Sequence, residues 1–502
     1  MAGKPGLREA QAAVDAGSAA ARQDPNRPIY HAMCPANWMN DPNGPILVED
    51  EVHVFYQHHP FKADWGPMYW GHVKSKDLVH WSHQPIAFGP SWDQGEDGCW
   101  SGSCIHGPGG LPHALYTSVG KDRPALDKSE QWLVVGSKDM ARWEKSPANP
   151  VMTHVLHGKV RIEDWRDPFV WHAGEGIYYC VIGGHLVQDG KPKHNPAAFL
   201  YKSPDMVHWT FLGPMYSRFK GGVDARVGPG VNLGTNWECP LFFPLGDKHV
   251  LAVSVNGTAY TIGTFKDEKF AAQGNWYPLD YSDMFYAPHA FADAKGRRIV
   301  IGWIRTEKHP HWSGCFSLPR VVTDRGDETL GIVPVPELDV LHGKHVHVDG
   351  VAIQAGSARP MISSKPFAAV SGGRAIELRF TMPLAGSASG ELVPPPFELA
   401  LYEPIAGKQS FIGCIGFEPE ESLIFIGNKS GVLHAGEGEN VLEARLFIDQ
   451  GIVELFINGR WALTNEIPVE PTTRLAIVAK AAEGAAVEFE EIECWEMKSI
   501  WG

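Results

Sequence analysis

The sequence predicts an all-β chain in which a β-propeller is followed by a β-sandwich. The unit Ser-x-Asp-apolar-x-x-Trp occurs three times, ending at Trp81, Trp143 and Trp209, at spacings of 62 and 66 residues. A repeat of this length, carried by short β-branched and aromatic runs, is typical of propeller blades. The last third of the chain instead alternates apolar and polar residues over short segments. That pattern is typical of antiparallel strands with one buried face, and it indicates a sandwich.

Four runs in the same part of the chain have the composition of buried strands, being short, apolar and bounded by Gly, Pro or Asp. They are residues 52–58, 131–137, 177–184 and 249–255. About 300 residues divided by a period of about 64 gives four to five blades. Because Asp77, Asp139 and Asp205 recur once per repeat, we assign them to turns or caps, and the repeated tryptophans to the core between blades.

The character of the chain changes near residue 336, which sets the expected domain boundaries. We predict an N-terminal tail or short helix at 1–27, a propeller at 28–335, a linker with a helical turn at 336–345 and a sandwich at 346–502. In the sandwich, Asn458-Gly459 is a hairpin signal. Asp449 and Glu454 are expected to face solvent from its strands.

Composition excludes several classes of protein. A chain of 502 residues is long enough for two domains, and 44% hydrophobic with 20% charged residues is typical of a globular protein. The formal charge of −14 repels polyphosphates, so neither nucleic acid nor an anionic membrane is an expected partner.

The first 28 residues contain no apolar run of a signal peptide, which predicts a cytoplasmic protein as the sequence stands and a secreted one if a leader was removed. The eight cysteines are scattered and are expected to be mostly free, buried thiols.

In each of three short motifs, a carboxylate in aromatic surroundings is followed by a proline, directly or after one residue. Asp41 lies in WMNDPNG, where Pro42 and the Asn-Gly turn hold the backbone rigid. Asp167 lies in RDP and Glu238 in ECP. Hydrolysis of a sugar bond requires a nucleophile, a proton donor and an electrostatic partner, and three such carboxylates can supply these groups.

These motifs resemble those of glycoside hydrolase family 32, which contains invertases, inulinases and levanases. Other segments occur in the same order as in that family, from about residue 28 to about 335: FYQHHP, WGPMYWGH, WSGS, FYAPHAF and SGCFSLPR. The later segment 444–459, ARLFIDQGIVELFING, resembles the sandwich domain of the family. The resemblance implies five blades.

The resemblance also implies roles for individual residues. Asp41 matches the nucleophile of a retaining enzyme, Glu238 the acid/base and Asp167 the carboxylate that stabilises the transition state. Apolar neighbours are expected to raise the pKa of Glu238, whereas amide donors near Asp41 are expected to favour its ionised form. Substrate-binding roles fall on Asn40, Gln57, Trp65, Trp100, Ser101 and Arg166. No cofactor is required, and no metal site is evident from the sequence.

The implied function is hydrolysis of terminal fructosyl linkages in sucrose, fructo-oligosaccharides or fructans. A fructosyltransferase with the same three carboxylates, an inverting arabinan-type glycosidase and a non-catalytic sugar-binding propeller are the alternatives. The sequence departs from the family pattern at Trp100, His289 and the pair Asp280 and Asp283, positions that we expect at the rim of the pocket. The sequence leaves open whether the substrate is sucrose, inulin-type or levan-type fructan, or sucrose 6-phosphate. It also leaves open whether the action is exo or endo and what the oligomeric state is.

Overall fold

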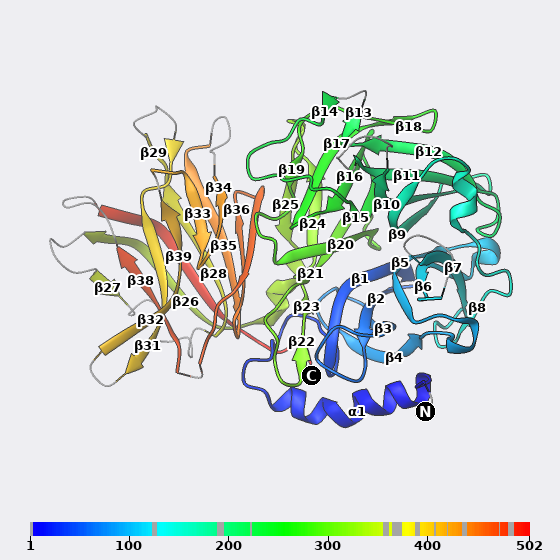
Figure 1. Cartoon of the computed structure of the whole chain (residues 1–502). Coiled ribbons are helices and arrows are strands. Elements are labelled where there is room, and N and C mark those ends of the chain that lie inside the picture. The colour runs from blue at the N-terminus through cyan, green and yellow to red at the C-terminus, as the bar shows by residue number, and fades with distance from the viewer. Residues whose placement is uncertain are drawn as a thin grey trace. The chain divides into compact units, whose positions relative to one another are not determined.

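The computed structural model of the chain consists mostly of β-strands (Figure 1). It describes residues 4–122, 128–187, 195–220, 223–354, 361–363, 374–386, 392–405, 408–418, 420–433, 439–470, 472–479 and 486–501. The chain divides into two compact units. The first comprises Met1–Arg22, Met33–Pro278 and Phe285–Leu330, and the second comprises Gln23–Ala32, Leu279–Met284 and Gly331–Gly502.

The first unit is a five-bladed β-propeller, each blade being a sheet of four or five strands. Blade one contains β1 (Asn37–Val48), β2 (Glu51–His59), β3 (Tyr69–Ser75), β4 (Ser82–Phe88) and β22 (Trp312–Ser313). Blade two contains β5 (Gly98–His106), β6 (Pro112–Val119), β7 (Ser129–Gly136) and β8 (Trp143–Lys145), and blade three contains β9 (Ile162–His172), β10 (Tyr178–Leu186), β11 (Asn195–Ser203) and β12 (Thr210–Ser217). Blade four contains β15 (Glu238–Leu245), β16 (Lys248–Ser254), β17 (Thr258–Lys266), β18 (Lys269–Ala272) and β19 (Tyr277–Pro278). Blade five contains β20 (Phe285–Ala292), β21 (Arg298–Ile304), β23 (Cys315–Phe316), β24 (Arg320–Asp324) and β25 (Leu330–Pro334).

The innermost strands of the blades form a closed ring. β1 contacts β5, β5 contacts β9, β9 contacts β15, β15 contacts β20, and β20 returns to β1. The short strand β22 pairs in parallel with β1, so a late segment of the propeller joins the first blade. Because the ring is closed, its five inner strands bring residues far apart in the sequence to one axis.

The repeated units form the turns between the third and fourth strands of the first three blades, as the sequence predicts. In the first, the Asp77 carboxylate accepts hydrogen bonds from the backbone N–H groups of Val79 and His80 at 2.9 and 2.8 Å. Asp205 repeats this pattern in the third. Trp81 and Trp209 are each only 6% exposed, which confirms their place in the core.

The N-terminal helix α1 (Leu7–Gln23) lies against the propeller. The amide oxygen of Gln11 accepts a hydrogen bond from the backbone N–H of Ile86, which lies on edge strand β4. Two side chains, Tyr69 and Trp92, donate to the carbonyl of Pro5 just before the helix. The Ala-rich segment is therefore a packed helix that covers an open strand edge.

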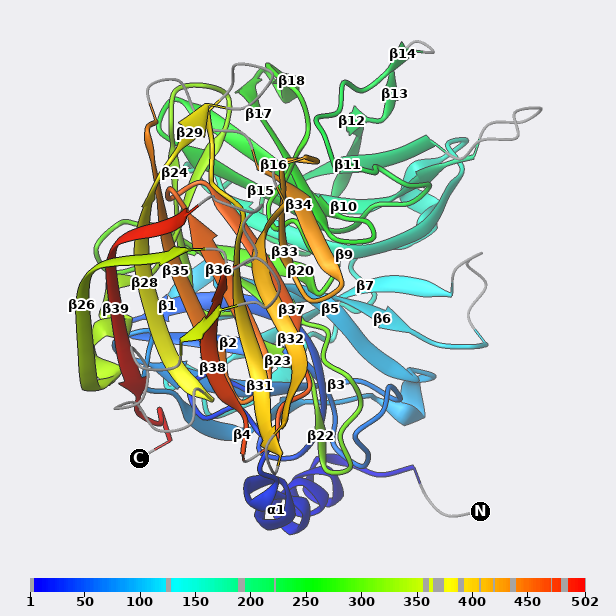
Figure 2. The same cartoon turned by 90° about the vertical axis from the view of Figure 1, so that its left-hand side faces the viewer.

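The second unit is a β-sandwich of two six-stranded antiparallel sheets, drawn from green at β26 through yellow to red in Figure 2. One sheet has the order β26 (His342–Gln354), β39 (Ala486–Met497), β28 (Ala375–Pro383), β35 (Val441–Asp449), β36 (Ile452–Ile457) and β37 (Trp461–Glu466). The other has the order β27 (Met361–Ser363), β38 (Arg474–Ala479), β31 (Phe397–Ile405), β32 (Lys408–Glu418), β33 (Leu423–Ile426) and β34 (Lys429–Val432). Alternate residues such as Leu378, Leu446 and Leu455 form the core between them. Asn458 and Gly459 adopt φ of 49° and 58°, as a type I′ hairpin turn requires.

The remaining short elements connect these sheets. They are the strand pairs β13 (Phe219–Lys220) with β14 (Val223–Asp224) and β29 (Ala385–Gly386) with β30 (Leu392–Val393), and the 3-10 helices η1 (Trp92–Gln94), η2 (Pro108–Gly110), η3 (His154–His157) and η4 (Pro336–Leu341). The segment expected as a linker is thus η4 followed directly by strand β26, which begins at His342 and not after residue 345.

The sandwich unit includes residues 28–32, 279–284 and 331–335, which were expected in the propeller, and residues 23–27, which were expected in the N-terminal tail. The backbone N–H groups of Ile29, Tyr30 and His31 each donate to the Asp449 carboxylate over 2.8 Å. In the second segment, Asp280 accepts hydrogen bonds from the backbone and the hydroxyl of Thr464. Asp280 is therefore buried in the sandwich unit, and its expected place at the rim of a pocket is wrong.

The expectation that Asp449 and Glu454 face solvent is also wrong, because both are fully buried. Alternation does place them on the face of their sheet that is opposite to the core. That face, however, is covered by residues 29–31, and the His31 ring lies 2.8 Å from Asp449 and 3.0 Å from Glu454. The alternating pattern identifies the two faces of a strand, but it does not show what covers the second one.

The cysteine side chains are free thiols. Cys99, Cys104 and Cys180 are buried, as expected.

None of the helices described by the structure has the length and apolar character needed to cross a membrane.

Candidate active site

All five inner strands of the propeller share one irregularity. In each, the pairing with the second strand of the blade is interrupted at the same level, between Met39 and Pro42, Cys99 and Gly102, Arg166 and Phe169, Glu238 and Leu241, and Tyr286 and His289. In four of the strands the interruption contains an x-Pro pair. Asp167, Cys239 and Ala287, each before a proline, adopt φ of 67°, 44° and 44°. Left-handed backbone at residues with a side chain is uncommon and often marks a functional site.

The irregularity brings two sets of residues to the axis of the propeller. The residues directly before the proline, or its equivalent in blade two, are Asp41, Ser101, Asp167, Cys239 and Ala287. The residues one position earlier are Asn40, Trp100, Arg166, Glu238 and Tyr286. Four residues of the first set, Ser101, Asp167, Cys239 and Ala287, line a cavity together with the prolines of the four strands. Asp41 contacts this lining through Ser101 and Cys239. The three carboxylates singled out in the sequence therefore converge, although almost 200 residues separate Asp41 from Glu238.

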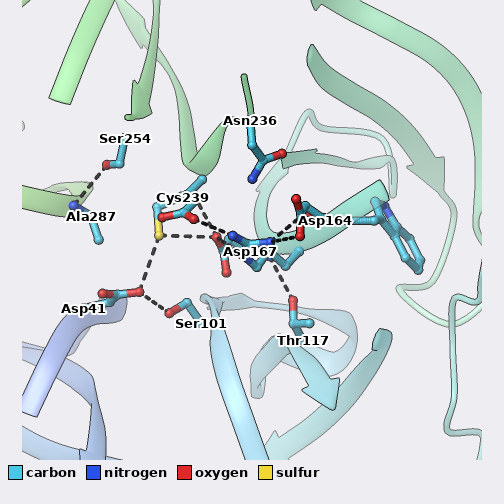
Figure 3. Close-up of polar contacts among 12 residues, drawn as sticks. Asp41, Ser101, Thr117, Asp164, Asp167, Asn236, Cys239, Ser254 and Ala287 are labelled. Atoms are coloured by element: carbon cyan, nitrogen blue, oxygen red, sulfur yellow. Dashed lines mark hydrogen bonds and ion pairs between the residues drawn. The ribbon is translucent and has the colours of Figure 1, made fainter. Parts of the chain in front are cut away.

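Asp41 is held by three donors. The Ser101 hydroxyl donates to its Oδ2 over 2.5 Å, and the Cys239 thiol lies 3.5 Å from Oδ2 (Figure 3). The Asn40 amide donates to its Oδ1 over 3.0 Å. Burial nevertheless raises the pKa of Asp41 above its ordinary value, and these hydrogen bonds offset only part of the rise. The expectation that nearby donors leave the ionised form favoured is wrong, because the desolvation of the carboxylate outweighs them.

Asp167 lies on the other side of the same thiol. Its Oδ2 accepts a hydrogen bond of 2.9 Å from the backbone N–H of Cys239 and lies 3.5 Å from the sulfur. Its own backbone N–H donates to the Thr117 hydroxyl over 2.9 Å, which fixes the left-handed turn. Burial raises the pKa of Asp167 to about 6, although the charge of Arg166 opposes the rise.

Glu238 is bound through both carboxylate oxygens. Arg166 Nη2 donates to Oε1, and the Tyr286 hydroxyl donates to Oε2 over 2.5 Å. The same guanidinium lies 3.2 Å from Asp164 and 3.9 Å from Asp167. One cation is thus shared among three carboxylates, and their charges raise the pKa of Arg166 in spite of its burial.

The other predicted site residues occupy different places around this centre. Asn40 bridges Asp41 and the Trp38 indole, whose N–H donates to its amide oxygen over 2.7 Å. Trp65 is 58% exposed and contacts Trp100 edge to face, with ring centroids 6.2 Å apart. Gln57 is buried on β2, where its amide donates to the carbonyl of Cys99 over 3.0 Å.

Two protein-family models match this chain. The model "Glycosyl hydrolases family 32 N-terminal domain" matches residues 31–333, and "Glycosyl hydrolases family 32 C terminal" matches residues 361–496. The chain belongs to glycosyl hydrolase family 32. It is therefore a glycoside hydrolase, as the motifs predict.

Individual relatives in family 32 agree with this placement. The chain is 31% identical over 483 residues to sucrose-6-phosphate hydrolase from Escherichia coli, covering 92% of this chain and 93% of the relative. It is 34% identical to raffinose invertase from Escherichia coli over 342 residues, covering 63% of this chain and 66% of the relative. The crystal structure of fructan 1-exohydrolase IIa from Cichorium intybus matches with a TM-score of 0.76 at 26% identity, covering 95% of this chain and 98% of that one.

The sequence analysis missed two side chains of this family 32 site. Tyr286 is bonded to Glu238, and Cys239 lies between Asp41 and Asp167. A signal for Tyr286 was present in FYAP, because Tyr286 precedes Pro288 by the same two positions that separate Glu238 from Pro240. No comparable signal distinguishes Cys239, whose importance follows from the convergence of two distant strands.

Groups with the side chains of a metal site occur in the sandwich unit. The ligand atoms of Asp339, His342 and Glu377 lie within 4.8 Å of one another, as do those of His347, Glu491 and Glu493. Arg379 and Arg445 both donate to Glu377, so the first group is part of an ion-pair network. Neither group includes a residue of the family 32 carboxylate centre.

Proposed function

We propose that the protein hydrolyses terminal β-fructofuranosyl linkages with retention of configuration. In this proposal Asp41 is the nucleophile, Glu238 the acid/base and Asp167 the carboxylate that stabilises the transition state. The observation that carries the proposal is the placement of Asp41 and Asp167 at 3.5 Å on either side of the Cys239 thiol, with Glu238 as the adjacent residue in the chain. A fructosyl ring seated over this centre has carboxylates within reach of both its anomeric carbon and its leaving oxygen.

The reaction has two displacement steps. In the first, an Asp41 oxygen forms a bond to C2 of the fructosyl unit while the bond from C2 to the leaving oxygen breaks, and Glu238 transfers its proton to that oxygen. In the second, Glu238 takes a proton from water, the hydroxide oxygen bonds to C2, and the ester bond to Asp41 breaks. Both transition states carry positive charge on the fructosyl ring, so a nearby carboxylate such as Asp167 stabilises them.

The surrounding residues position these groups. Ser101 and Asn40 fix the two oxygens of Asp41 before substrate binds, which limits reorganisation during attack. Arg166 and Tyr286 orient Glu238. Trp65 and Trp100 offer apolar faces to the C–H groups of a sugar, and Gln57 is assigned a supporting polar role in the binding of the fructosyl unit.

The substrates proposed are sucrose, sucrose 6-phosphate and short fructans. Relatives that cover most of this chain are named sucrose-6-phosphate hydrolase, and a structural neighbour is a fructan 1-exohydrolase. All of these compounds share a terminal β-fructosyl unit, which is the part recognised by the carboxylates.

The test is product analysis with single-residue variants. Purified protein is incubated separately with sucrose, sucrose 6-phosphate, inulin and levan, and products are resolved by chromatography over time. We expect free fructose from the wild type and a loss of about 10³-fold or more in Asp41→Asn and Glu238→Gln, because each removes a group that makes or breaks a bond. Asp139→Asn, which alters a turn aspartate of blade two, serves as the matched control and retains activity.

Two results would contradict the proposal. Near-normal turnover in Asp41→Asn or Glu238→Gln removes that residue from the mechanism. Inversion at C2, read by NMR of the first fructose formed, excludes the covalent intermediate. Formation of longer fructosides at high sucrose would instead identify transfer to a sugar acceptor.

A further inference from the structure

An aromatic wall connects the nucleophile to the acid/base on one side of the active site. The Trp38 indole is bonded to Asn40 beside Asp41, and its ring contacts Trp303 edge to face at 5.9 Å. Trp303 contacts Tyr286 at 6.4 Å, and the Tyr286 hydroxyl reaches Glu238. The wall therefore ends at the residue that protonates the leaving group.

Arg305 lies over the end of this wall. Its guanidinium carbon is 5.0 Å from the centroid of Tyr286 and 5.7 Å from that of Trp303. Arg305 directly follows the last residue of β21, and its side chain is exposed. The backbone just beyond is fixed, because the Thr306 hydroxyl accepts a hydrogen bond of 2.8 Å from the N–H of Gly314. A short, pinned segment thus holds this cation one aromatic ring away from Glu238.

Arg305 differs from Arg166 and Lys308 in having no anionic partner among the described residues. Arg166 is shared by Glu238, Asp164 and Asp167, and Lys308 pairs with Asp64 at 2.7 Å. Within the part of the chain that the structure describes, no carboxylate pairs with Arg305. This is notable in a protein with a formal charge of −14, where acidic residues outnumber basic ones by 58 to 44.

Because the Arg305 side chain is exposed, its N–H donors are available to a ligand. These donors lie in the plane of the guanidinium and point outward in a fork. That fork matches the oxygens of a phosphate group, which it binds with two parallel hydrogen bonds. Neutral hydroxyls make weaker bonds to the same donors.

We propose that Arg305 forms an anion-binding subsite for the leaving group, and that the preferred leaving sugar carries a phosphate ester. This inference rests on the proposed function, because it assigns Arg305 to the side from which Glu238 protonates the leaving oxygen. Arg305 contacts the substrate phosphate in this proposal and takes no part in bond cleavage. It therefore sets specificity and leaves the chemistry of the fructosyl unit unchanged.

The test compares a neutral and a phosphorylated leaving group in the same enzyme. The values of kcat/KM are measured for sucrose and for sucrose 6-phosphate, together with competitive inhibition of sucrose hydrolysis by glucose and by glucose 6-phosphate. The variants are Arg305→Gln, which removes the charge, and Arg305→Lys, which keeps the charge without the fork. Arg298→Gln is the matched control, since Arg298 also lies over an aromatic ring, that of Phe243, but at the opposite end of β21.

We expect the wild type to prefer sucrose 6-phosphate over sucrose, and glucose 6-phosphate to inhibit more strongly than glucose. Arg305→Gln should lower both ratios by about tenfold or more, while kcat/KM for sucrose itself changes less than about threefold. Arg305→Lys should give intermediate ratios, and Arg298→Gln the wild-type ratios. Inhibition is measured on sucrose turnover, so it reports binding of the leaving group separately from the cleavage of the phosphorylated substrate.

Two outcomes would overturn the inference. One is a wild type with equal kcat/KM for sucrose and sucrose 6-phosphate and with equal inhibition by glucose and glucose 6-phosphate. The other is an Arg305→Gln variant with unchanged ratios. Either result leaves the proposed function standing as long as fructose is released from sucrose, whereas failure to release fructose from any β-fructoside would instead reject the proposed function.

Discussion

The Cys239 thiol lies 3.5 Å from Oδ2 of Asp41, and it lies equally close to Asp167. Burial, followed by the charges of the two aspartates, raises the pKa of this thiol well above its ordinary value. Cys239 therefore stays protonated. It acts as a weak donor between two carboxylates and does not add a third negative charge to the site.

Replacement of Cys239 should move the acidic limb of the pH profile. Cys239→Ala removes a donor from Asp41, so the pKa of Asp41 rises further and the acidic limb of kcat/KM moves to higher pH by about 0.5 unit. Cys239→Ser supplies a stronger donor and should move the limb to lower pH. The measurement is kcat/KM for sucrose from pH 3 to 8, with Cys180→Ala as a buried-thiol control. Shifts of the same sign in both Cys239 variants would argue against hydrogen bonding as the cause.

Tyr286 should be a positioning residue for Glu238. Burial and the charge of Glu238 raise the pKa of Tyr286, so the phenol stays protonated and donates its 2.5 Å hydrogen bond at every working pH. We expect Tyr286→Phe to lower kcat for sucrose by about tenfold or more, because a hydrogen bond to a charged group is lost while the ring remains. Tyr69→Phe, which removes another phenol hydrogen bond, should leave kcat unchanged. A normal kcat in Tyr286→Phe would show that Arg166 alone is sufficient to orient Glu238.

The buried, ionised carboxylate of Asp167 should lower the free energy of unfolding of the protein. Its pKa of about 6 in the folded state exceeds the ordinary value of 3.8, so the folded protein binds the proton more tightly than the unfolded chain. The resulting cost develops as pH rises from about 4 to about 6, and it reaches about 3 kcal/mol above that range. Asp167→Asn is expected to be inactive but to unfold at a higher temperature than the wild type at pH 8. The difference should shrink below pH 4, and thermal unfolding at both pH values checks it. An Asp167→Asn variant less stable than the wild type at pH 8 would show that the ion pair with Arg166 dominates.

The features that repeat in the sequence are those that it predicted well. Asp77 and Asp205 recur with their tryptophans because the first three blades use the same turn between their third and fourth strands, and the spacing of these turns predicts a propeller. The carboxylates Asp41, Asp167 and Glu238 were recognisable because a proline follows each of them, directly or after one residue, and shapes its strand. Sequence rules for turns and prolines are sufficient where the interactions that shape a feature lie within a short segment of the chain.

What the sequence did not reveal depends on contacts between distant segments. Asp280 looks like a polar loop residue until Thr464 is found beside it, 184 residues later in the chain. The pKa of Asp41 depends on the burial of its carboxylate in the folded protein, which the adjacent residues of the sequence do not show. The sandwich boundary was misplaced for the same reason, because residues 23–32 join that unit through Asp449, which is more than 400 residues away.

His31 is expected to make the stability of the sandwich unit depend on pH at the alkaline side. Burial alone would lower the pKa of His31, but the hydrogen bonds and charges of Asp449 and Glu454 outweigh it and raise the pKa to about 9. The stabilisation is fully present below the unfolded value of 6.5 and is lost as pH rises through about 9, amounting to about 3 kcal/mol.

The measurement is thermal unfolding of the whole chain from pH 6 to 10, in the wild type and in His31→Gln. The wild type should lose stability between pH 7 and 9.5. His31→Gln should be less stable by about 3 kcal/mol at pH 6, because it leaves two buried carboxylates without a cation, and its stability should vary less with pH in this range. His208→Gln, at an exposed histidine paired with Asp205, serves as the control and should follow the wild type. If His31→Gln lost stability with pH as steeply as the wild type, another group would have to carry the alkaline transition, and the buried His31 would be a structural hydrogen-bonding residue without a charge.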